Sequence, residues 1–577
     1  MQPGIYWCDT CRSAIELDCS AICPKCGQVA RYMTTDARPV FARERRILEF
    51  YEHRDLSSTV VWKSSKSKYY YADGQSIALP RYKQLKHDLP SIAAYIGVSD
   101  HYDALDERLI VDYRRQFQVS HQCLLALEDE AFQFIKHVTQ RFSHREVLVS
   151  FSGGKDSTVV SSLVRRALGD ADVLHIFGDT TLEDENTYKY VRQFREANSL
   201  IPFFTARSER NFHELVEEIG PPSRVMRWCC TIFKVGPIND ILQSFGDQQV
   251  LTFYGIRRNE SARRSQYHKL SWNNPDHMGT VVKVSQDDEL NGVTVGAKIG
   301  QQATASPIID WSEFDVWNYI ISHNLLFNKS YRLGFSRIGC WLCPMNSRWS
   351  ETLANIFFPD KMESWKKQLV RFACRIGKTD PEEYIEERGW VKRFGGAGLP
   401  NRFRGLDTRP CGEMDNAVQI EIERPVNADL EEFLKPLGKI NRNRGRPALG
   451  EIYLEGQRNQ AWDALIVQAP ENSTVLRFTV INPKQDMRRL AWYFRQQAAK
   501  FQTCIQCTAC SAVCPHGAIT VNSALRLYQI DQDACTGCME CVTHFDAPGC
   551  LVAKSLSVYG QAAAKDTVTR PANVPVS

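Results

Sequence analysis

The sequence predicts a multidomain α/β chain in which a mostly parallel sheet is joined to smaller, cysteine-bound metal modules. A buried strand pattern at 147–151 leads through a glycine-rich loop into a helical pattern at 159–168, and such units build parallel sheets. Two Cys-x-x-Cys pairs stand near the N-terminus, and eight more cysteines gather between 504 and 550. A length of 577 residues allows about four domains of ~150 residues each.

Composition and charge describe an ordinary globular chain. Hydrophobic residues make up 43% and charged residues 24%, and the net charge of +4 does not by itself indicate a nucleic-acid partner. No apolar run reaches the ~18 residues that span a bilayer. The N-terminus also lacks the pattern of a signal peptide, so we expect a cytoplasmic protein with no membrane partner.

The grouping of the cysteines favours metal binding over disulfides. Sixteen of the twenty cysteines fall into Cys-x-x-Cys or Cys-Cys groups, which in a reducing compartment are more often metal ligands. Of the other four, Cys123, Cys374 and Cys411 are predicted to be small buried residues. Cys19, in the loop between the two N-terminal pairs, is predicted not to be a ligand, and substitution for one of the four knuckle cysteines is the alternative.

Residues 1–30 are predicted to form a zinc ribbon. Two Cys-x-x-Cys knuckles separated by a short loop supply the four thiolates of a tetrahedral zinc site, and a redox or iron site is the alternative. The predicted ligands are Cys8, Cys11, Cys23 and Cys26.

Residues 31–120 are predicted to be an α+β segment that mixes basic and aromatic side chains. Lys63 and Lys68 are interleaved with Trp62 and with the tyrosines at 69–71. That mixture suits a surface that stacks on bases and neutralises phosphates. A solvated hairpin whose tyrosines face a core explains the same pattern, so both interpretations stay open.

The glycine-rich loop has the features of a phosphate-binding turn. It reads Ser152-Gly153-Gly154-Lys155-Asp156-Ser157 and lies between the strand and the helix. The two glycines allow close backbone approach, the helix N-terminus presents N–H groups, and Lys155 with the two serine hydroxyls adds donors to an anion. The Walker form of the loop is absent.

Two more polar clusters follow predicted strands. Asp179 and Thr180 come directly after the strand at 172–178, and an arginine-rich run follows the strand at 250–255. Because ligands of an open α/β sheet bind at the carboxyl ends of its strands, we expect the three clusters to meet in one site. The run contains Arg257, Glu260 and Arg264.

Together with the segment 307–317, these motifs resemble the phosphoadenosine-phosphosulfate reductase family of PP-loop enzymes, over about residues 121–390. The resemblance implies an adenine nucleotide alpha hydrolase-like fold with a site of the ATP-pyrophosphatase type. It implies that the nucleotide is bound by Ser152, Gly153, Gly154, Ser157, Asp179 and Thr180. It implies catalytic roles for Lys155, Asp156, Arg257, Glu260 and Arg264.

Two cysteine pairs in the same region resemble the Cys-Cys plus Cys-x-x-Cys set that holds a 4Fe–4S cluster in adenylyl-sulfate reductases and in the nucleotide-activating component of DNA phosphorothioation systems. The pairs are Cys229-Cys230 and Cys340-x-x-Cys343. Four thiolates satisfy such a cluster, and zinc is the alternative. The C-terminal catalytic cysteine motif of the reductases has no match here, which argues against thiol attack on an activated sulfate.

Residues 500–557 are predicted to form a bacterial-type ferredoxin domain with two 4Fe–4S clusters, followed by a tail at 558–577. The run Cys-x-x-Cys-x-x-Cys-x-x-x-Cys-Pro is that of bacterial ferredoxins, in which the fourth cysteine ligates the other cluster. This cross-over assigns Cys504, Cys507, Cys510 and Cys550 to one cluster and Cys514, Cys535, Cys538 and Cys541 to the other. A glycine hinge at 395–400 and a small α+β connecting domain at 400–495 are predicted upstream.

These features predict an enzyme that adenylylates an acceptor with ATP, releases pyrophosphate and couples this activation to iron–sulfur-dependent sulfur transfer, as in DNA phosphorothioation or tRNA thiolation. Two alternatives stay open. One is a ferredoxin-driven reductase of adenylyl sulfate or phosphoadenylyl sulfate, and the other is a nucleic-acid-binding assembly subunit with a regulatory nucleotide site. The expected cofactors are three 4Fe–4S clusters, Zn²⁺, Mg²⁺ and ATP or adenylyl sulfate. The expected partners are an electron donor, a DNA or RNA acceptor and a cysteine desulfurase.

Overall fold

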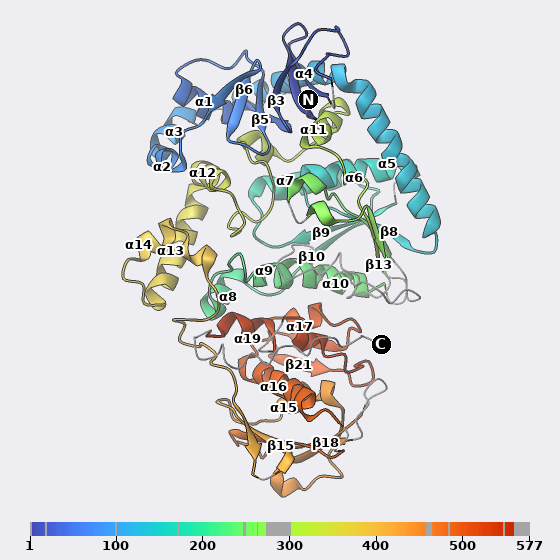
Figure 1. Ribbon diagram of the computed structural model, residues 1–577, viewed down its shortest axis with the longest axis vertical. Coiled ribbons are helices and arrows are strands. Elements are labelled where there is room, and N and C mark those ends of the chain that lie inside the picture. Colours follow the sequence, from blue (N-terminus) through green and yellow to red (C-terminus); the bar gives the residue numbers. More distant parts are fainter. Residues whose placement is uncertain are drawn as a thin grey trace. The chain divides into compact units, whose positions relative to one another are not determined.

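The computed structural model describes residues 3–17, 20–97, 101–169, 172–245, 250–261, 264–272, 302–412, 414–456, 464–482, 485–545 and 549–558. The chain divides into two compact units (Figure 1). The first comprises Met1–Ala206, Phe245–Met278 and Gln301–Trp365, and the second comprises Arg207–Ser244, Gly279–Gly300 and Lys366–Ser577. Among the helices of the described ranges, none has the length and apolar character needed to cross a bilayer.

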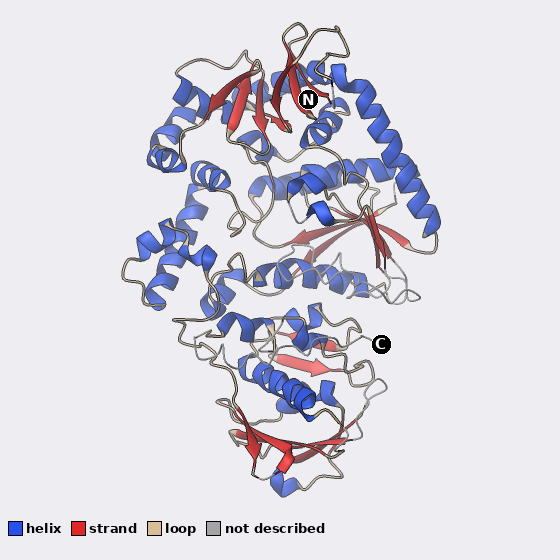
Figure 2. Cartoon of the chain, viewed as in Figure 1, coloured by secondary structure: helices blue, strands red, loops and turns tan. Residues whose placement is uncertain are grey.

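The first unit begins with two small antiparallel sheets. One has the strand order β2-β1-β3 and the other β4-β5-β6-β7 (Figure 2). The strands are β1 Gly4–Cys8, β2 Ser13–Leu17, β3 Arg31–Thr34, β4 Ala37–Pro39, β5 Val61–Ser64, β6 Tyr69–Ala72 and β7 Gln75–Ala78. Helices α1 Ala42–Glu52, α2 Tyr82–His87 and α3 Leu89–Ile96 accompany them. Because β3 completes the N-terminal sheet, this module continues past residue 30.

Aromatic residues of the 31–120 segment belong mainly to the hydrophobic core. Trp62 and Tyr70 are fully buried, and Trp62 packs edge-on against Tyr113. The Trp62 Nε1 donates to Gln116 Oε1 at 3.1 Å. The interpretation in which aromatic side chains face a core therefore holds for Trp62 and Tyr70, whereas Tyr69 is exposed.

A six-stranded sheet forms the centre of the first unit, in the order β10-β9-β8-β11-β13-β12. Its strands are β8 Glu146–Ser150, β9 Leu174–Asp179, β10 Phe203–Arg207, β11 Val250–Phe253, β12 Leu270–Trp272 and β13 Gln302–Ala305. β8 is parallel to both β9 and β11, β11 is parallel to β13, and β12 is antiparallel to β13. The prediction of a multidomain α/β chain with a mostly parallel sheet is confirmed.

Further helices of the first unit pack on its sheets or on one another. They are α4 His101–Phe117, α5 His121–Arg141, α6 Lys155–Leu168, α7 Glu185–Ala197, α11 Glu313–Ser322 and α12 Arg348–Phe357. α6 follows the predicted apolar spacing, since Val159, Val160 and Leu163 have no exposed surface. α11 begins in a capping box between Ser312 and Asp315. One cluster of buried residues, which extends from Ile5 to Leu353, joins the small sheets to the central sheet.

The second unit contains a helical segment and an antiparallel sheet. The helical segment consists of α8 Phe212–Ile219, α9 Trp228–Cys230, the π-helix η2 Thr231–Val235 and α10 Gly236–Gln243. The sheet has the order β14-β15-β19-β18-β17-β16. Its strands are β14 Thr408–Cys411, β15 Met414–Glu421, β16 Lys439–Asn441, β17 Glu451–Glu455, β18 Ala464–Gln468 and β19 Val475–Val480. Helices α13 Pro359–Arg375 and α14 Pro381–Glu386 precede this sheet in the sequence.

The antiparallel sheet and the eight-cysteine region share one hydrophobic core. α15 Leu430–Leu434 and α16 Met487–Thr503 pack with a hairpin of β20 Ile519–Asn522 and β21 Leu527–Ile530. The short helices α17 Ala509–Ala512, α18 Glu540–Thr543 and α19 Leu551–Leu556 complete this part. The cluster of buried residues runs from Ile420 to Val542, so the connecting domain and the cysteine region fold as one body.

Two predictions, one about the segment 395–400 and one about ungrouped cysteines, are wrong. The segment 395–400 is held by tertiary contacts and does not form a hinge. The N–H of Gly396 donates to Ser557 O at 2.8 Å, and a Cβ at Gly396 would lie 2.1 Å from Leu556 O. Of the ungrouped cysteines, Cys123 and Cys374 are exposed, and Cys411 alone of the three is buried. In α13 the buried face carries Leu369, Phe372 and Ala373, and Cys374 lies outside this buried face. Cys19 lies outside the described residues.

Candidate active site and metal centres

The order of the central sheet reverses direction at β8. From β8 the chain passes to β9 and β10 on one side, and then returns to β11 on the other side. Ligands of open α/β sheets bind at such a reversal of strand order. The loops that follow β8, β9 and β11 all end at this edge because these strands are parallel, and they carry the three polar clusters predicted from the sequence.

Two glycines bring the loops into close contact. Gly153 has a φ of +72°, and a Cβ there would lie 3.2 Å from Thr187 Cγ2. A Cβ at Gly255, in the loop after β11, would lie 2.7 Å from the backbone carbon of Asp156 and 2.8 Å from the nitrogen of Ser157. Backbone therefore packs directly on backbone between the first turn of α6 and the loop that leads to Arg257.

The glycine-rich loop is held by hydrogen bonds within its own turn. Ser157 Oγ accepts from the N–H of Ser152 at 3.1 Å and donates to Gly154 O at 2.9 Å. Gly154 is the N-cap of α6 and brings no side-chain cap. The N–H of Lys155 donates to Tyr331 Oη at 2.9 Å. The first turn of α6 thus combines a positive helix end with a lysine, which is the arrangement that binds phosphate.

A cluster of buried charges lies at the start of α6. The Nζ of Lys155 is 3.1 Å from Asp156 Oδ2 and 3.6 Å from Glu313 Oε1, and Arg257 Nε donates to Asp156 Oδ1 at 2.6 Å. Lys155 and Arg257 are 3% and 4% exposed. Although burial pushes the pKa of Asp156 upward, Arg257 and Lys155 together hold it well below its usual range. Asp156 is therefore ionised at neutral pH.

The remaining predicted catalytic residues continue this chain of charges. Arg257 Nη2 is 3.8 Å from Glu260 Oε1, and the other carboxylate oxygen of Glu260 forms an ion pair with Arg264. The structure thus brings together all five residues to which the resemblance gave catalytic roles, which run from Lys155 through Asp156, Arg257 and Glu260 to Arg264. Their roles stay predictions.

Asp179 and Thr180 lie at the end of β9, and both are buried. Asp179 Oδ1 accepts from the N–H of Thr181 and from Tyr188 Oη, each at 2.8 Å. Thr180 Oγ1 donates to Glu183 Oε1 at 2.7 Å and lies 3.2 Å from the sulfur of Cys340. The first cysteine of the Cys340-x-x-Cys343 pair therefore contacts Thr180, which directly follows the carboxyl end of β9.

Sequence reasoning missed a carboxylate pair that supports the charge cluster. Glu313 Oε2 accepts from Ser65 Oγ at 2.6 Å, and the N–H of Glu313 donates to Asp36 Oδ2 at 3.0 Å. Burial and the neighbouring Glu313 raise the pKa of Asp36 to about 6. Burial also acts upward on the pKa of Glu313, but Lys155 and Arg257 lower it below the usual value. The capping-box pattern at 312–315 signals a helix start, but no local pattern pairs it with residue 36 or 65.

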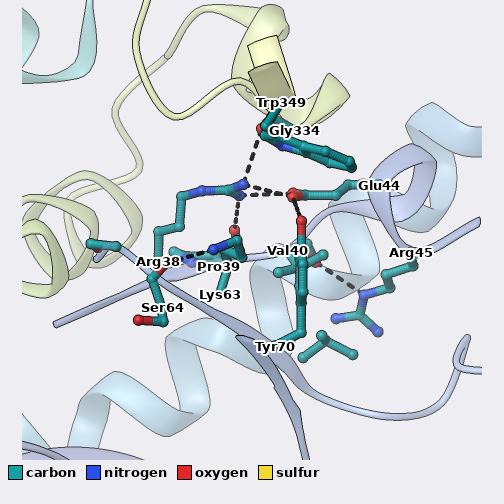
Figure 3. Close-up of polar contacts among 12 residues, drawn as sticks. Arg38, Pro39, Val40, Glu44, Arg45, Lys63, Ser64, Tyr70, Gly334 and Trp349 are labelled. Atoms are coloured by element: carbon teal, nitrogen blue, oxygen red, sulfur yellow. Dashed lines mark hydrogen bonds and ion pairs between the residues drawn. The ribbon is translucent and has the colours of Figure 1, made fainter. Parts of the chain in front are cut away.

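A second buried network connects the N-terminal segment with the turn at Gly334. Arg38 donates to both carboxylate oxygens of Glu44, at 2.8 and 2.6 Å, and to Gly334 O at 3.0 Å (Figure 3). Tyr70 Oη donates to Glu44 Oε1 at 2.7 Å, and Trp349 Nε1 donates to Gly334 O at 3.2 Å. This network orients the chain just before Ser336, whose carbonyl oxygen is 3.3 Å from Lys155 Nζ.

The four cysteines of the predicted third cluster occur as two ordered turns. The N–H of Cys343 donates to Cys340 O at 3.2 Å, and Asn346 Nδ2 closes the same turn on Trp341 O at 2.9 Å. Cys229 and Cys230 lie in α9, directly before the π-helix η2, a rare form that is frequent at functional sites. Cys340 and Cys343 belong to the first unit, whereas Cys229 and Cys230 belong to the second. That the two pairs hold one cluster therefore stays a prediction.

The N-terminal cysteines converge as the two-knuckle pattern predicts. The sulfurs of Cys8, Cys11, Cys23 and Cys26 all lie within 4.8 Å of one another. The N–H of Cys11 donates to Cys8 Sγ at 3.4 Å, as expected of a Cys-x-x-Cys knuckle. Four sulfurs at such separations fit a single tetrahedral metal ion. Among the described residues, these four cysteines are the group of potential metal ligands whose ligand atoms all lie within 4.8 Å of one another.

The positions of the C-terminal cysteines are compatible with the predicted cross-over, and their assignment as cluster ligands stays a prediction. Cys504, Cys507, Cys510 and Cys550 line one cavity. The thiols of Cys535 and Cys538 interact electrostatically with those of Cys541 and Cys514. The two halves repeat one local geometry, since Thr508 and Met539 each adopt a positive φ just before α17 and α18. The donor sets fit two 4Fe–4S clusters.

Comparison with known families agrees with this geometry. Residues 146–346 match the phosphoadenosine phosphosulfate reductase domain, and residues 503–544 match the 4Fe-4S dicluster domain. The chain therefore carries a phosphoadenosine phosphosulfate reductase domain of the PP-loop class, followed by a ferredoxin-type iron–sulfur domain. Proteins of this class are enzymes.

Several individual proteins are similar to parts of the chain. Two uncharacterized proteins of Methanocaldococcus jannaschii match parts of the chain. The first is 34% identical over 267 residues, which are 46% of this chain and 48% of that protein. The second is 30% identical over 248 residues, which are 43% of this chain and 53% of that protein. The chain spans about half the length of these two relatives. The adenosine 5'-phosphosulfate reductase of Geobacillus thermodenitrificans is 24% identical over 200 residues, 34% of this chain and 72% of that enzyme. A solved phosphoadenylyl-sulfate reductase structure from Candida auris is 13% identical, with 46% of this chain and 98% of that chain covered at a TM-score of 0.27.

Proposed function

We propose that the chain activates an acceptor by adenylylation with ATP, releases pyrophosphate and then directs sulfur to the activated atom with electrons from its own dicluster domain. A nucleic acid is the favoured acceptor class, as in DNA phosphorothioation or tRNA thiolation. One observation carries the coupling: the sulfur of Cys340 lies 3.2 Å from Thr180 Oγ1, at the sheet edge that also holds the phosphate loop. The proposed sulfur-handling cysteine and the proposed nucleotide site would therefore share one edge.

The nucleotide step uses the buried cations at the start of α6. An acceptor oxygen forms a bond to the α-phosphorus of ATP, and the bond from that phosphorus to the bridging oxygen breaks, so pyrophosphate leaves with the electron pair. Negative charge grows on the leaving group, and Lys155, Arg257 and the N–H groups of α6 stabilise it. Both cations contact carboxylates whose oxygens a phosphate would replace. Mg²⁺ would offset further phosphate charge.

The sulfur step displaces the adenylate. The terminal sulfur of a persulfide forms a bond to the activated carbon or phosphorus, the bond to the adenylate oxygen breaks, and AMP leaves. The resulting acceptor–S–S linkage takes up two electrons and two protons to give a thiolated acceptor and a free thiol. When bound, the two 4Fe–4S clusters of the dicluster domain would supply such electrons one at a time. A cysteine desulfurase is the class of enzyme that supplies the persulfide.

A contact inside the second unit supports internal electron supply. Cys229 and Cys230 open the continuous helical segment that ends with α10. Asn239, in α10, donates from Nδ2 to Ala512 O at 2.8 Å, and Ala512 belongs to α17 with Cys510. This contact joins the cysteine pair to the first cluster set of the dicluster domain through packed protein, and Asn239 is 1% exposed.

We propose further that Zn²⁺ occupies the N-terminal four-cysteine site. The four sulfurs stand close enough to ligate one ion, and a closed set of four thiolates is typical of structural zinc. The site would then stabilise the sheet that packs against the central domain.

A reductase of adenylyl sulfate is the second candidate. It is favoured by the relatives named adenosine 5'-phosphosulfate reductase, which are 23–25% identical to this chain. In that reaction, uptake of two electrons splits the bond between sulfur and the bridging oxygen and releases sulfite and AMP.

Exchange of labelled pyrophosphate into ATP tests the proposal. Anaerobically purified protein is assayed in parallel with DNA, with tRNA and without acceptor, while a second series contains adenylyl sulfate and a low-potential reductant and is analysed for sulfite. Exchange that depends on a nucleic acid supports adenylylation. Sulfite release without exchange supports the reductase, and tight ATP binding with neither reaction supports an assembly subunit.

Two variants link the measured activity to the site. Asp156→Ala removes the carboxylate that orders both cations and should abolish exchange. Asp310→Ala is the matched control, because this side chain is 57% exposed and pairs with Arg258 on the surface. Exchange that survives in Asp156→Ala would place the chemistry elsewhere in the chain.

A further inference from the structure

A buried lysine lies against the two cysteine sets of the dicluster domain. Lys500, near the end of α16, is 2% exposed. Its Nζ donates to Tyr528 Oη at 2.7 Å and stands 4.8 Å from the centre of the Tyr528 ring. Lys500 and Tyr528 line the same cavity as the first cysteine set. The ammonium group is therefore held inside the domain and cannot reach solvent.

No carboxylate balances this charge within the described part of the chain, since no ion pair involves Lys500 there. An unpaired ammonium in a protein interior costs several kcal/mol, so buried lysines normally have a counter-charge. Apart from Tyr528, the ionisable groups that interact with Lys500 are thiols of both cysteine sets: Cys504, Cys510, Cys514, Cys535 and Cys541. Cys510 belongs to the first set and Cys541 to the second.

We propose that Lys500 is a counter-ion shared by both 4Fe–4S clusters and that its positive charge sets their reduction potentials. Four thiolates give each oxidised cluster a net negative charge, and uptake of one electron makes that charge larger. A fixed cation in a low-dielectric interior therefore stabilises the reduced form more than the oxidised form. Because Lys500 interacts with a ligand of each set, both potentials are raised together.

Tyr528 fixes the position of this charge. Its ring stacks on Phe433 with centroids 4.4 Å apart and an interplanar angle of 12°. The hydroxyl is thus held by β21 while the lysine is held by α16, and the hydrogen bond joins the two elements. Lys500 would act on the clusters through its charge, and Tyr528 would act through Lys500 as a positioning residue.

This inference goes beyond the proposed function, because it concerns the dicluster domain alone and holds for any acceptor. It explains why a lysine is tolerated at a fully enclosed position of a helix whose neighbouring buried residues include Ala498, Ala499 and Phe501. The charge of Lys500 would also affect electron supply, because clusters with lower reduction potentials are harder for a given donor to reduce.

Redox titration of the full-length protein tests the assignment. Lys500→Met keeps the length and apolar stem of the side chain and removes the charge. Lys439→Met is the matched control, because it removes the same charge from an exposed position of β16 in the same unit. Iron and sulfide are counted for each variant, and the midpoint potentials are followed by electron paramagnetic resonance at stepped potentials.

We expect Lys500→Met to retain its iron and to shift both midpoints to more negative values. A tenfold change in the ratio of reduced to oxidised cluster at a fixed potential corresponds to about 59 mV for one electron, and we expect at least this shift. Lys439→Met should leave both midpoints unchanged. Tyr528→Phe keeps the charge and should give a smaller shift than Lys500→Met.

The result that overturns the assignment is a Lys500→Met protein that holds the same iron and has wild-type potentials. A shift confined to one cluster would overturn the shared role. If Lys500→Met fails to bind iron, Lys500→Gln keeps a donor for Tyr528 without the charge. Iron with more negative midpoints in Lys500→Gln supports the proposal, whereas unchanged midpoints or missing iron in that variant reject it.

Discussion

Replacing Arg257 with methionine removes the guanidinium while keeping an apolar side chain of similar length. Arg257 is 4% exposed, and its Nε donates to Asp156 Oδ1 at 2.6 Å. Its Nη2 is 3.8 Å from Glu260 Oε1, beyond hydrogen-bond distance. The outer nitrogens are therefore the ones we expect to contact a phosphate oxygen of ATP, in the forked manner that suits guanidinium and oxyanion.

Two effects of different size follow from this geometry. A hydrogen bond to a charged group contributes about 1.5–3 kcal/mol, which corresponds to about 10- to 150-fold in ATP affinity. The same substitution leaves the buried Asp156 with Lys155 as its remaining cation, and breaking a buried ion pair costs about 3–5 kcal/mol of stability. The Asp156→Asn, Arg257→Met double variant removes the carboxylate charge that has lost one of its two cations, so it should recover thermal stability without recovering ATP affinity.

Calorimetric titration with a non-hydrolysable ATP analogue measures the first effect, and thermal unfolding measures the second. Arg258→Met is the control, because its ion pair with Asp310 is on the surface and such pairs contribute about 1 kcal/mol or less. The control should change ATP affinity by less than about fivefold. An Arg257→Met protein that folds and binds the analogue as tightly as wild type would refute the phosphate role of this residue.

Three further predictions use other parts of the first unit. Gly255→Ala would place a Cβ 2.7 Å from the backbone of Asp156, so pyrophosphate exchange should be lost, whereas Gly339→Ala, with no atom within 4 Å of its Cβ, should retain it. Cys23→Ser should lower the zinc content measured by mass spectrometry and the melting temperature, while Cys374→Ser, an exposed cysteine outside the predicted sets, should change neither; zinc retained in Cys23→Ser would reject the site. Asp36 has a pKa raised to about 6 by burial and Glu313, so the folded state holds a proton that an unfolded aspartate, with a pKa of about 3.9, releases. Stability should therefore fall by about 3 kcal/mol as the pH rises from about 4 to 6, and Asp36→Asn should lose this dependence; equal slopes of melting temperature against pH in both proteins would contradict the assignment.

Short motifs were predictable because covalent spacing alone brings their groups together. The glycine-rich loop lies at the junction of β8 and α6 as the strand-to-helix change of period indicated, and the N-terminal knuckles converge because each holds its sulfurs three residues apart. The predicted cross-over of Cys550 to the first set came from the resemblance to ferredoxins and not from its spacing, and Cys550 lines the same cavity as that set.

Burial of aromatic and small residues was less predictable, because it depends on what packs over them. Trp62 and Tyr70 sit among lysines in the sequence, yet both lie in the core that joins the small sheets to the central sheet. The residues next to Gly396 in the sequence give no sign that it is packed, but Leu556 and Ser557 contact it in the fold. A composition typical of a linker or of a basic surface thus conceals contacts made over long separations in sequence.

The sequence by itself determined which chemical modules this chain contains: a phosphate loop, a zinc-type knuckle pair and two ferredoxin cysteine runs. Each of these modules depends on residue types at a fixed short spacing, and residues that are close in sequence stay close in space in any fold. Only the tertiary structure decided that Glu313, Asp36 and Ser65 support Lys155, and that Lys500 faces both cysteine sets. A charge acquires such a partner through burial, where the low dielectric makes an unbalanced group costly, and burial is a property of the packed chain.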